Sequence, residues 1–369
     1  MRRENIYVTA TMRPNIFRLV VGLLRIYFRN SWTNRGFEVK KLESHFNNEL
    51  SNSTILMSNG TLPLVFLIRW LRENYGVGEV ITTPFTYIAT ASAVVWEGMT
   101  PVYVDIDPET LSPTLDTLES KISKKTKGIL LTQVFGVMWN LSELEQLSSK
   151  YGIPVFFDAA HSIGSKYKGK SLLRFGTASS FSLHATKIIS ATEGGGLSIN
   201  SLEPNLKERI YQMHNFGHNS KSSKFESVGL NAKMSEFSAL FAFLTYIKLK
   251  YSINKRRKIY ELYKSKLNNN RHLRLFNIPA DFDWNYAYCP ILFNSEELLE
   301  IALQELNKNS VFPRRYFWPS LSDLKFLGGK FDCPIATNIS SRIMCLPIYP
   351  SLRRKEVIAV AETLNTLGV

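Results

Sequence analysis

From about residue 55 onward, short apolar runs alternate with longer segments whose apolar residues recur at helical spacing. Most runs are bounded by Gly, Pro, Asp or Ser, which is typical of buried parallel strands, and they predict strands over residues 80–83, 101–106, 128–134, 153–157, 178–182 and 196–199. The intervening segments predict helices over residues 62–74, 89–97, 115–122 and 141–151, the last opened by a capping box of Ser142 and Glu145. The alternation predicts an α/β fold whose mainly parallel central sheet carries helices on both faces.

Two strongly apolar segments lie on either side of this block. Residues 17–28 predict an amphipathic helix, because Arg18 and Arg25 interrupt the run and it is shorter than the about 20 residues that span a bilayer. We expect this helix to be buried against the body of the protein or against a partner chain. Residues 235–249 predict a helix so apolar that a monomer would expose too much hydrophobic surface, which indicates a dimer interface.

The C-terminal part of the chain has its own pattern. A strand is predicted over residues 286–293 and a helix over residues 295–307, which together indicate a smaller α+β unit. With a boundary near residue 250, we expect an N-terminal arm over residues 1–50, a large α/β domain over residues 51–250 and a small α+β domain over residues 251–369. A chain of 369 residues agrees with about two domains of roughly 100–200 residues each.

The cysteines and the N-terminus indicate a reducing, cytoplasmic location. Cys289, Cys333 and Cys345 are odd in number and include no Cys-x-x-Cys pair that would begin a zinc site or a redox motif. Arg2 and Arg3 are not followed by an uninterrupted apolar core with a cleavage site, so we expect no signal peptide and no stable membrane insertion.

The formal net charge is +14, which fits a nucleic-acid partner, an anionic membrane surface or anionic small-molecule substrates. Residues 248–274 contain ten Lys or Arg and one acidic residue, Glu261. No motif that reads a groove or stacks on bases accompanies this stretch, so we interpret it as a solvated helix face and expect no nucleic-acid partner.

Two charged residues follow predicted strands and point to a particular chemistry. Asp158 comes just after an apolar strand, and Lys187 lies 29 residues further on at another junction of strand and loop. Ligands of α/β sheets bind outside the carboxyl ends of the strands. A partly desolvated lysine there can form a Schiff base, and a nearby aspartate can keep a pyridine nitrogen protonated. Separately, such an Asp is often a capping residue and such a Lys a solvated charge.

A possible phosphate cradle strengthens this combination. Ser58-Asn-Gly-Thr61 directly precedes a predicted helix whose free N–H groups and dipole suit a phosphate, and its alternative role is a plain helix N-cap. Tyr87 follows another strand, where its ring either stacks on a flat heterocycle or packs in the core.

These residues resemble the DegT-type family of nucleotide-sugar aminotransferases, which are fold-type I enzymes that use pyridoxal phosphate. The resemblance runs from roughly Trp32 to the C-terminus, and the motifs occur in family order: Asn59-Gly-Thr61, Pro84-Phe-Thr-Tyr-Ile-Ala-Thr90, Pro101-Val-Tyr-Val-Asp-Ile-Asp107, Asp158-Ala-Ala-His161, Ser182-x-x-x-x-Lys187, Glu193-Gly-Gly and Gly229-x-Asn-x-Lys-Met-Ser-Glu236. The order and spacing of seven motifs make chance agreement very improbable.

The resemblance implies a role for each matching residue. Lys187 would form the Schiff base with the cofactor, and Asp158 would pair with its pyridinium nitrogen. Tyr87 would stack on the ring, and His161 would lie near the ring oxygen. The phosphate would be held by Gly60, Thr61, Ser182 and, from the neighbouring subunit, Asn231. The last residue implies a homodimer with shared active sites.

The resemblance also implies the substrates. L-glutamate would donate the amino group, and a nucleotide-linked keto-sugar would accept it. The net positive charge of the chain would then suit the anionic diphosphate of this sugar substrate. The segment 312–319, together with residues 181–187 and 229–233, is most similar to the subgroup that acts on dTDP-4-keto-6-deoxyhexoses. Candidate contacts to the nucleotide phosphates or the sugar are Lys233, Arg314 and Tyr316, with surface charge as the alternative. His184 would serve catalysis or simply bond to the backbone.

Several alternatives stay open from the sequence. A 3-keto-sugar aminotransferase would use the same machinery, and a non-catalytic relative would bind a membrane or polyanion through its basic segments. A sugar dehydratase is disfavoured because Lys187 is present, and a nicotinamide dehydrogenase because Gly194-Gly-Gly196 is not the Gly-x-Gly-x-x-Gly turn.

Overall fold

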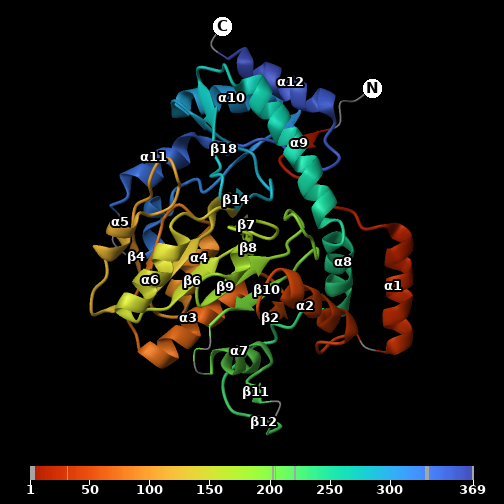
Figure 1. The fold of residues 1–369 in the computed structure, drawn as a ribbon, viewed down its shortest axis with the longest axis vertical. Coiled ribbons are helices and arrows are strands. Elements are labelled where there is room, and N and C mark those ends of the chain that lie inside the picture. Colours follow the sequence, from red (N-terminus) through yellow and green to blue (C-terminus); the bar gives the residue numbers. More distant parts are fainter. Residues whose placement is uncertain are drawn as a thin grey trace.

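A seven-stranded sheet forms the centre of the computed structural model, which describes residues 5–30, 32–201, 203, 205–219, 222–328 and 332–367 (Figure 1). Across the sheet the strands are β2 (Thr54–Met57), β10 (Gly195–Ile199), β9 (Ala178–Ser182), β6 (Val155–Asp158), β5 (Thr126–Thr132), β3 (Glu79–Thr82) and β4 (Thr100–Tyr103). Only β10 runs against its neighbours within this sheet, so the predicted mainly parallel arrangement is confirmed.

Successive side chains of the central strands point to opposite faces of the sheet and enter two different cores. Leu130 and Phe156 belong to the core that includes α3 (Thr61–Tyr75), α4 (Ile88–Trp96) and α7 (Leu206–His214). Leu131 and Phe157 belong to the core that includes α6 (Leu141–Tyr151) and α5 (Leu115–Glu119). Helices therefore cover both faces, as predicted.

The predicted helix over residues 141–151 matches α6, but its predicted capping box is wrong. The helix begins at Leu141, so Ser142 already lies inside it, and the N-cap is Asn140 in the left-handed region at φ 58°. Strand β2 was missed because its four buried residues are too short a run to distinguish from the helices around it.

The N-terminal helices pack on α8 (Glu236–Tyr246) and correct one expectation. Both α1 (Ile16–Arg29) and α2 (Phe37–Glu49) contact α8, and Leu240 and Leu244 share a buried cluster with Ile26 of α1. The apolar face of α8 is thus largely covered by its own chain, so the expectation that a monomer would leave it exposed is wrong. The dimer interface inferred from that expectation stays a prediction. Conversely, α1 buries only Gly22 and Ile26 and leaves most of its apolar side chains exposed.

The C-terminal part has its own antiparallel sheet. Its strands, in order, are β13 (Leu273–Leu275), β15 (Pro290–Phe293), β18 (Ile343–Cys345) and β17 (Arg314–Arg315). It is accompanied by α9 (Leu249–Leu267), α10 (Glu296–Lys308), α11 (Pro334–Arg342) and α12 (Arg354–Asn365). At the start of the chain, β1 (Ile6–Tyr7) pairs with β16 (Val311–Phe312). The two boundaries between the three predicted segments, near residues 50 and 250, stay predictions.

Helix α9 carries most of the basic stretch, and one of its arginines is not solvated. Arg256 is 2% exposed, and its guanidinium donates to the backbone oxygens of Ala287 at 3.1 Å and Ile348 at 2.6 Å. The interpretation of residues 248–274 as a solvated face is therefore wrong at this position, where the arginine holds α9 to the C-terminal unit.

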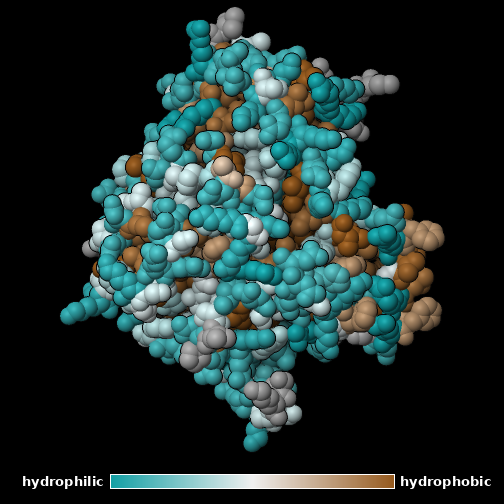
Figure 2. Space-filling model, viewed as in Figure 1, coloured by the Kyte–Doolittle hydropathy of each residue, from teal (hydrophilic) through white to brown (hydrophobic). Residues whose placement is uncertain are grey.

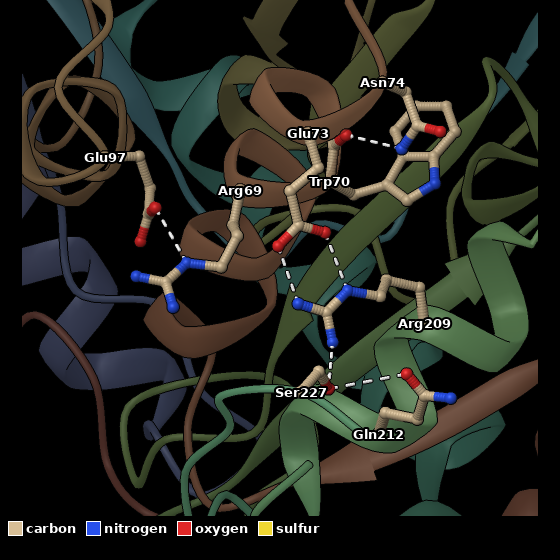
Figure 3. Close-up of polar contacts among 8 residues, drawn as sticks. All are labelled: Arg69, Trp70, Glu73, Asn74, Glu97, Arg209, Gln212 and Ser227. Atoms are coloured by element: carbon tan, nitrogen blue, oxygen red, sulfur yellow. Dashed lines mark hydrogen bonds and ion pairs between the residues drawn. The ribbon is translucent and has the colours of Figure 1, made fainter. Parts of the chain in front are cut away.

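Short strands complete the fold. β7 (Lys166–Tyr167), β8 (Lys170–Ser171) and β14 (Phe282–Asp283) form a small sheet, and β11 (His218–Asn219) pairs with β12 (Lys224–Phe225). Figure 3 shows how the region after α7 is held: Arg209 donates to the two carboxylate oxygens of Glu73 at 2.6 and 2.7 Å and to the hydroxyl of Ser227. Arg69 likewise joins α3 to buried Glu97 at the end of α4, at 2.9 Å (Figure 3). The segment that follows Ser227 is thereby fixed beside α7.

Candidate active site

A cavity of about 540 Å³ lies where the carboxyl ends of the central strands meet the segment 314–324. Its volume lies within the roughly 300–1,000 Å³ of small-molecule sites. It is lined by nine of the residues predicted for the site: Gly60, Thr61, Tyr87, Asp158, His161, Ser182, Lys187, Arg314 and Tyr316. The chain therefore brings together residues that are up to 256 positions apart in the sequence.

Asp158 is the last residue of β6 and is 5% exposed. One carboxylate oxygen accepts a hydrogen bond from the backbone N–H of Ala160 at 3.1 Å, and the other accepts from the hydroxyl of Thr90 at 2.7 Å. Burial raises the pKa of this carboxyl group, while these two hydrogen bonds and the charge of Lys187 oppose the shift. A cationic partner in the cavity would stabilise the ionised form further.

A chain of threonine hydroxyls supports Asp158, and the sequence analysis did not predict it. Thr90 also contacts the hydroxyl of Thr86 at 2.8 Å, which in turn contacts that of Thr132 at the end of β5. Because the carboxylate only accepts and each hydroxyl has a single proton, Thr132 donates to Thr86, Thr86 to Thr90 and Thr90 to Asp158. The chain fixes the direction in which the carboxylate points.

Lys187 lies in the loop between β9 and β10, and its Nζ atom is 3.1 Å from the hydroxyl oxygen of Tyr288. Burial lowers the pKa of this amine to about 8, with a smaller lowering by Arg314 and an opposing contribution from Asp158. A lysine with this pKa has a substantial neutral fraction near neutral pH, which a nucleophile requires. Tyr288 was missed by the sequence interpretation, because nothing near it in the chain marks it.

The imidazole of His161 is neutral and packs against aromatic side chains. Its Nδ1 atom accepts from the backbone N–H of Phe135 at 3.2 Å, which leaves the ring proton on Nε2, and its ring centroid is 4.2 Å from that of Tyr288. Burial, together with the charges of Lys187 and Arg314, lowers the pKa of His161 well below its ordinary value. The ring of Tyr316 lies edge-on to His161, 6.1 Å away.

The start of α3 forms a tight cradle against β9 and β10. A Cβ on Gly60 would lie 3.0 Å from the Cβ of Ser182, and one on Gly195 would lie 2.6 Å from the backbone of Asn59. The side-chain oxygen of Asn59 accepts hydrogen bonds from the backbone N–H groups of Thr61 and Leu62, both at 2.9 Å. Two of the helix N–H groups that were expected to bind a phosphate are therefore already hydrogen-bonded within the chain. Gly60 and the hydroxyls of Thr61 and Ser182 also line the cavity, and they fit the phosphate of pyridoxal phosphate.

Three other side chains at the cavity have distinct environments. Tyr87 is 57% exposed, which rules out the alternative that it packs in the core. Within the described residues Arg314 forms no ion pair, whereas its neighbour Arg315 pairs with Glu296 and Glu300. His184 contacts the hydroxyl and the backbone N–H of Thr186, which agrees with a structural role.

Two predicted residues lie outside this cavity. Asn231 forms a β-bridge with Asn215, and the Nζ atom of Lys233 donates to the side-chain oxygen of Asn215 at 2.9 Å while lying 4.5 Å from the centre of the Phe216 ring. The side chain of Lys233 therefore contacts the region after α7, and neither residue lines the cavity of its own chain.

Neither a metal centre nor a membrane span was found in the part of the chain that the structure describes. No group of three or more His, Cys, Asp or Glu is arranged to hold a metal ion among those residues. No described helix is long and apolar enough to cross a membrane.

Comparisons with known proteins agree with the motifs. The model of the DegT/DnrJ/EryC1/StrS aminotransferase family matches residues 21–365. The chain is 32% identical over 368 residues to the dTDP-4-amino-4,6-dideoxy-D-glucose transaminase of Shigella dysenteriae, covering 98% of this chain and 99% of the relative. It is 30% identical over 373 residues to the Escherichia coli enzyme of that name, covering 99% of both. A relative of different regiochemistry is the UDP-N-acetyl-3-dehydro-alpha-D-glucosamine 3-aminotransferase of Acidithiobacillus ferrooxidans, 27% identical over 309 residues, or 84% of this chain and 82% of the relative.

Solved structures share the fold. DesI, solved in the presence of its TDP-sugar product, superposes with a TM-score of 0.90 over 98% of this chain and 93% of that one, at 25% identity. The aminotransferase TlmJ of Streptoalloteichus hindustanus gives a TM-score of 0.89 over 98% of both chains, at 23% identity. The predicted fold class is confirmed.

Proposed function

Because the chain belongs to the DegT/DnrJ/EryC1/StrS aminotransferase family, we propose that it transfers the amino group of L-glutamate to C4 of dTDP-4-keto-6-deoxyglucose. Membership makes it a sugar aminotransferase dependent on pyridoxal phosphate. The observation that carries the proposal is the placement of Asp158 and Lys187 in one cavity at the carboxyl ends of the strands. The regiochemistry is supported by the names of two relatives that match over nearly the full chain.

Different residues of the cavity would hold different parts of the cofactor. When bound, pyridoxal phosphate supplies a protonated pyridine ring that accepts the electron pair left when the substrate loses its α-proton. Asp158, oriented by Thr90 and the backbone of Ala160, would hold the ring nitrogen in its protonated form. Gly60, Thr61 and Ser182, which line the same cavity, would hold the phosphate, and Tyr87 and His161 would contact the ring and its oxygen.

Lys187 has a second task once its amine is free, because it then moves the proton that the substrate loses and regains. A pKa of about 8 lets its Nζ atom take and return a proton near neutral pH. Tyr288 is neutral under these conditions, because burial raises the pKa of its hydroxyl well above the ordinary value. Its oxygen, 3.1 Å away, therefore accepts a hydrogen bond from Nζ and keeps the amine in the cavity.

The anionic part of the nucleotide sugar needs a cation that is not already paired. Arg314 lines the cavity and forms no ion pair with another described residue, so we assign it to the diphosphate and Tyr316 to the sugar. We assign Asn231 and Lys233 to the cavity of a second copy, in a homodimer with shared sites. The amino sugar would enter surface-glycan assembly in the cytoplasm.

Product analysis tests the proposal directly. The chain is incubated with pyridoxal phosphate, L-glutamate and dTDP-4-keto-6-deoxyglucose, and the product is examined by NMR. We expect an amino group at C4 and one equivalent of 2-oxoglutarate for each amino sugar formed. The second candidate, a 3-aminotransferase, is favoured by the Acidithiobacillus ferrooxidans relative. Turnover only with a 3-keto nucleotide sugar would establish it and contradict the C4 assignment.

A further inference from the structure

The outer face of α1 is the largest run of exposed apolar side chains on one described helix. In Figure 2 a hydrophobic band marks the edge of the molecule where Figure 1 places α1. Near its two ends, Phe17 is 78% exposed and Phe28 is 79% exposed. The face consists of Ile16, Phe17, Val20, Val21, Leu23, Leu24, Tyr27 and Phe28. Soluble chains seldom leave such a contiguous patch without a partner.

The inner face fixes α1 to the body, so the outer face cannot turn inward. A Cβ on Gly22 would lie 2.5 Å from a methyl carbon of Leu240, which shows how closely the backbone of α1 approaches α8. The guanidinium of Arg25 pairs with the carboxylate of Glu38 at 2.6 Å, and that carboxylate is 1% exposed. The apolar outer face is therefore presented to the surroundings by a helix that is held in place.

The segment that carries this face has charged side chains of one sign only. No Asp or Glu occurs between Glu4 and Glu38, whereas Arg13, Arg18 and Arg29 are exposed. The Nζ atom of Lys248 donates to the backbone oxygen of Arg13 at 3.0 Å, so the basic stretch of residues 248–274 begins beside the start of α1. An apolar face bordered by cations is complementary to a surface whose outer layer is anionic and whose interior is apolar.

We propose that α1 docks this enzyme onto an anionic lipid surface. The helix has 14 residues and so a length of about 21 Å at 1.5 Å per residue, too short to cross a hydrocarbon core of about 30 Å. It lies in the plane of the surface, with Phe17 and Phe28 among the acyl chains and the arginines at the headgroups. Two signals, the apolar face and the basic border, act together in reversible binding.

A second copy of the chain is a poorer occupant of the same face. In a symmetric contact between two α1 faces, Arg13, Arg18 and Arg29 of both copies would lie around the contact and not within it, and their positive charges would add. The segment between Glu4 and Glu38 offers no carboxylate to neutralise them. Like charges brought together across an interface oppose association, whereas anionic headgroups remove the repulsion.

Co-sedimentation of the cofactor-loaded full chain with vesicles tests the proposal. We expect binding to vesicles of equimolar phosphatidylcholine and phosphatidylglycerol, weaker binding to pure phosphatidylcholine, and release by salt. The variant Phe17→Ser/Phe28→Ser should lower the partition coefficient about tenfold or more, because two apolar anchors are lost. Trp96→Ser, which removes an aromatic side chain that is 77% exposed at the end of α4, should bind as the wild type does.

A charge variant separates the two signals. Arg13→Gln/Arg18→Gln should weaken binding to the anionic vesicles and reduce its dependence on salt, while leaving transamination unchanged as a check on folding. The proposal is overturned if the wild type does not bind the anionic vesicles, or if Phe17→Ser/Phe28→Ser binds them equally well. It is also overturned if that variant instead dissociates an oligomer in sedimentation velocity, since the face would then be an interface between copies.

Discussion

The residues predicted for the site fall into two groups that the structure treats differently. Asp158, at the end of β6, and Lys187, in the loop after β9, line one cavity of a single chain together with Thr61 and Ser182. Asn231 and Lys233 do not line that cavity, although their segment pairs with Met57 at the end of β2, and the side chain of Lys233 donates to Asn215 after α7. The first group has its supports within the chain. The second group has a role at the site only if a neighbouring copy supplies the cavity.

The difference lies in what each group depends on. A residue at the carboxyl end of a parallel strand is placed by the sheet itself, and Thr90 and Tyr288 then orient the two central side chains. A residue that does not line the cavity of its own chain acts at a site only if a second copy supplies that site. Mutations in the first group should therefore affect the chemistry of each chain, and mutations in the second should affect what two chains share.

The largest effect is expected for Lys187→Ala. The variant loses both the group that binds the cofactor covalently and the group that moves the proton, so transamination should fall by about 10⁴-fold or more. Circular dichroism and the thermal unfolding midpoint should stay close to those of the wild type, because the lysine side chain lies at the cavity. Turnover within about tenfold of the wild type would contradict the role of Lys187.

Asp158→Asn should have the next largest effect. The amide keeps the shape and can still accept from Thr90, but it supplies no negative charge to the pyridine nitrogen. We expect kcat to fall by about 100-fold with a smaller change in KM for glutamate, measured by steady-state kinetics. As a matched control, Thr90→Val should cost less, since it removes the orienting hydroxyl and leaves the charge in place.

Asn231→Ala tests whether a residue of the second group acts at the site of a neighbouring copy. If Asn231 of the partner subunit reaches the phosphate, the variant should bind pyridoxal phosphate about tenfold more weakly, as measured by equilibrium dialysis. At a pyridoxal phosphate concentration that leaves Asn231→Ala chains largely unloaded, mixing them with Lys187→Ala chains should then raise activity, because a hybrid dimer contains one site with both residues intact. Absence of any gain on mixing, with hybrid dimers demonstrated by mass spectrometry, would argue that the sites are not shared.

The smallest expected effect is a shift in pH dependence. The pKa of Lys187 is lowered to about 8, so the neutral amine increases as the pH rises through that value. The rate at which the cofactor-free chain captures pyridoxal phosphate should increase with pH and level off above about 8. Arg314→Met removes a positive charge that lowers this pKa, so the midpoint should move to higher pH. A midpoint near the 10.5 of an ordinary lysine in the wild type would contradict the burial of the amine.

The strand positions were predictable because buried parallel strands are short apolar runs between turn residues. Residues 178–182 match β9, and the strand predicted over residues 153–157 became β6, which ends at Asp158 itself. Alternating burial on the two faces of the sheet follows from the same pattern. These features depend on neighbours in the sequence, which is what a hydrophobic pattern records.

The supports of the site were not predictable, because they depend on packing between distant segments. Thr90 is 68 positions from Asp158, and Tyr288 is 101 positions from Lys187. A threonine in a helix or a tyrosine before a strand carries no local mark of such a contact. The same reason explains the wrong expectation that α8 would be exposed in a monomer. The sequence shows that the apolar face of α8 must be buried, but not that α1 and α2 of the same chain bury it.

The most direct test of the account is the visible absorption of the purified chain with pyridoxal phosphate, before and after L-glutamate and then with dTDP-4-keto-6-deoxyglucose. The account predicts a band from the lysine-bound cofactor that glutamate bleaches and the keto-sugar restores, and that is missing in Lys187→Ala. A wild-type chain without such a band, or a band that persists in Lys187→Ala, would contradict the claim that the cavity of Asp158 and Lys187 is the catalytic site.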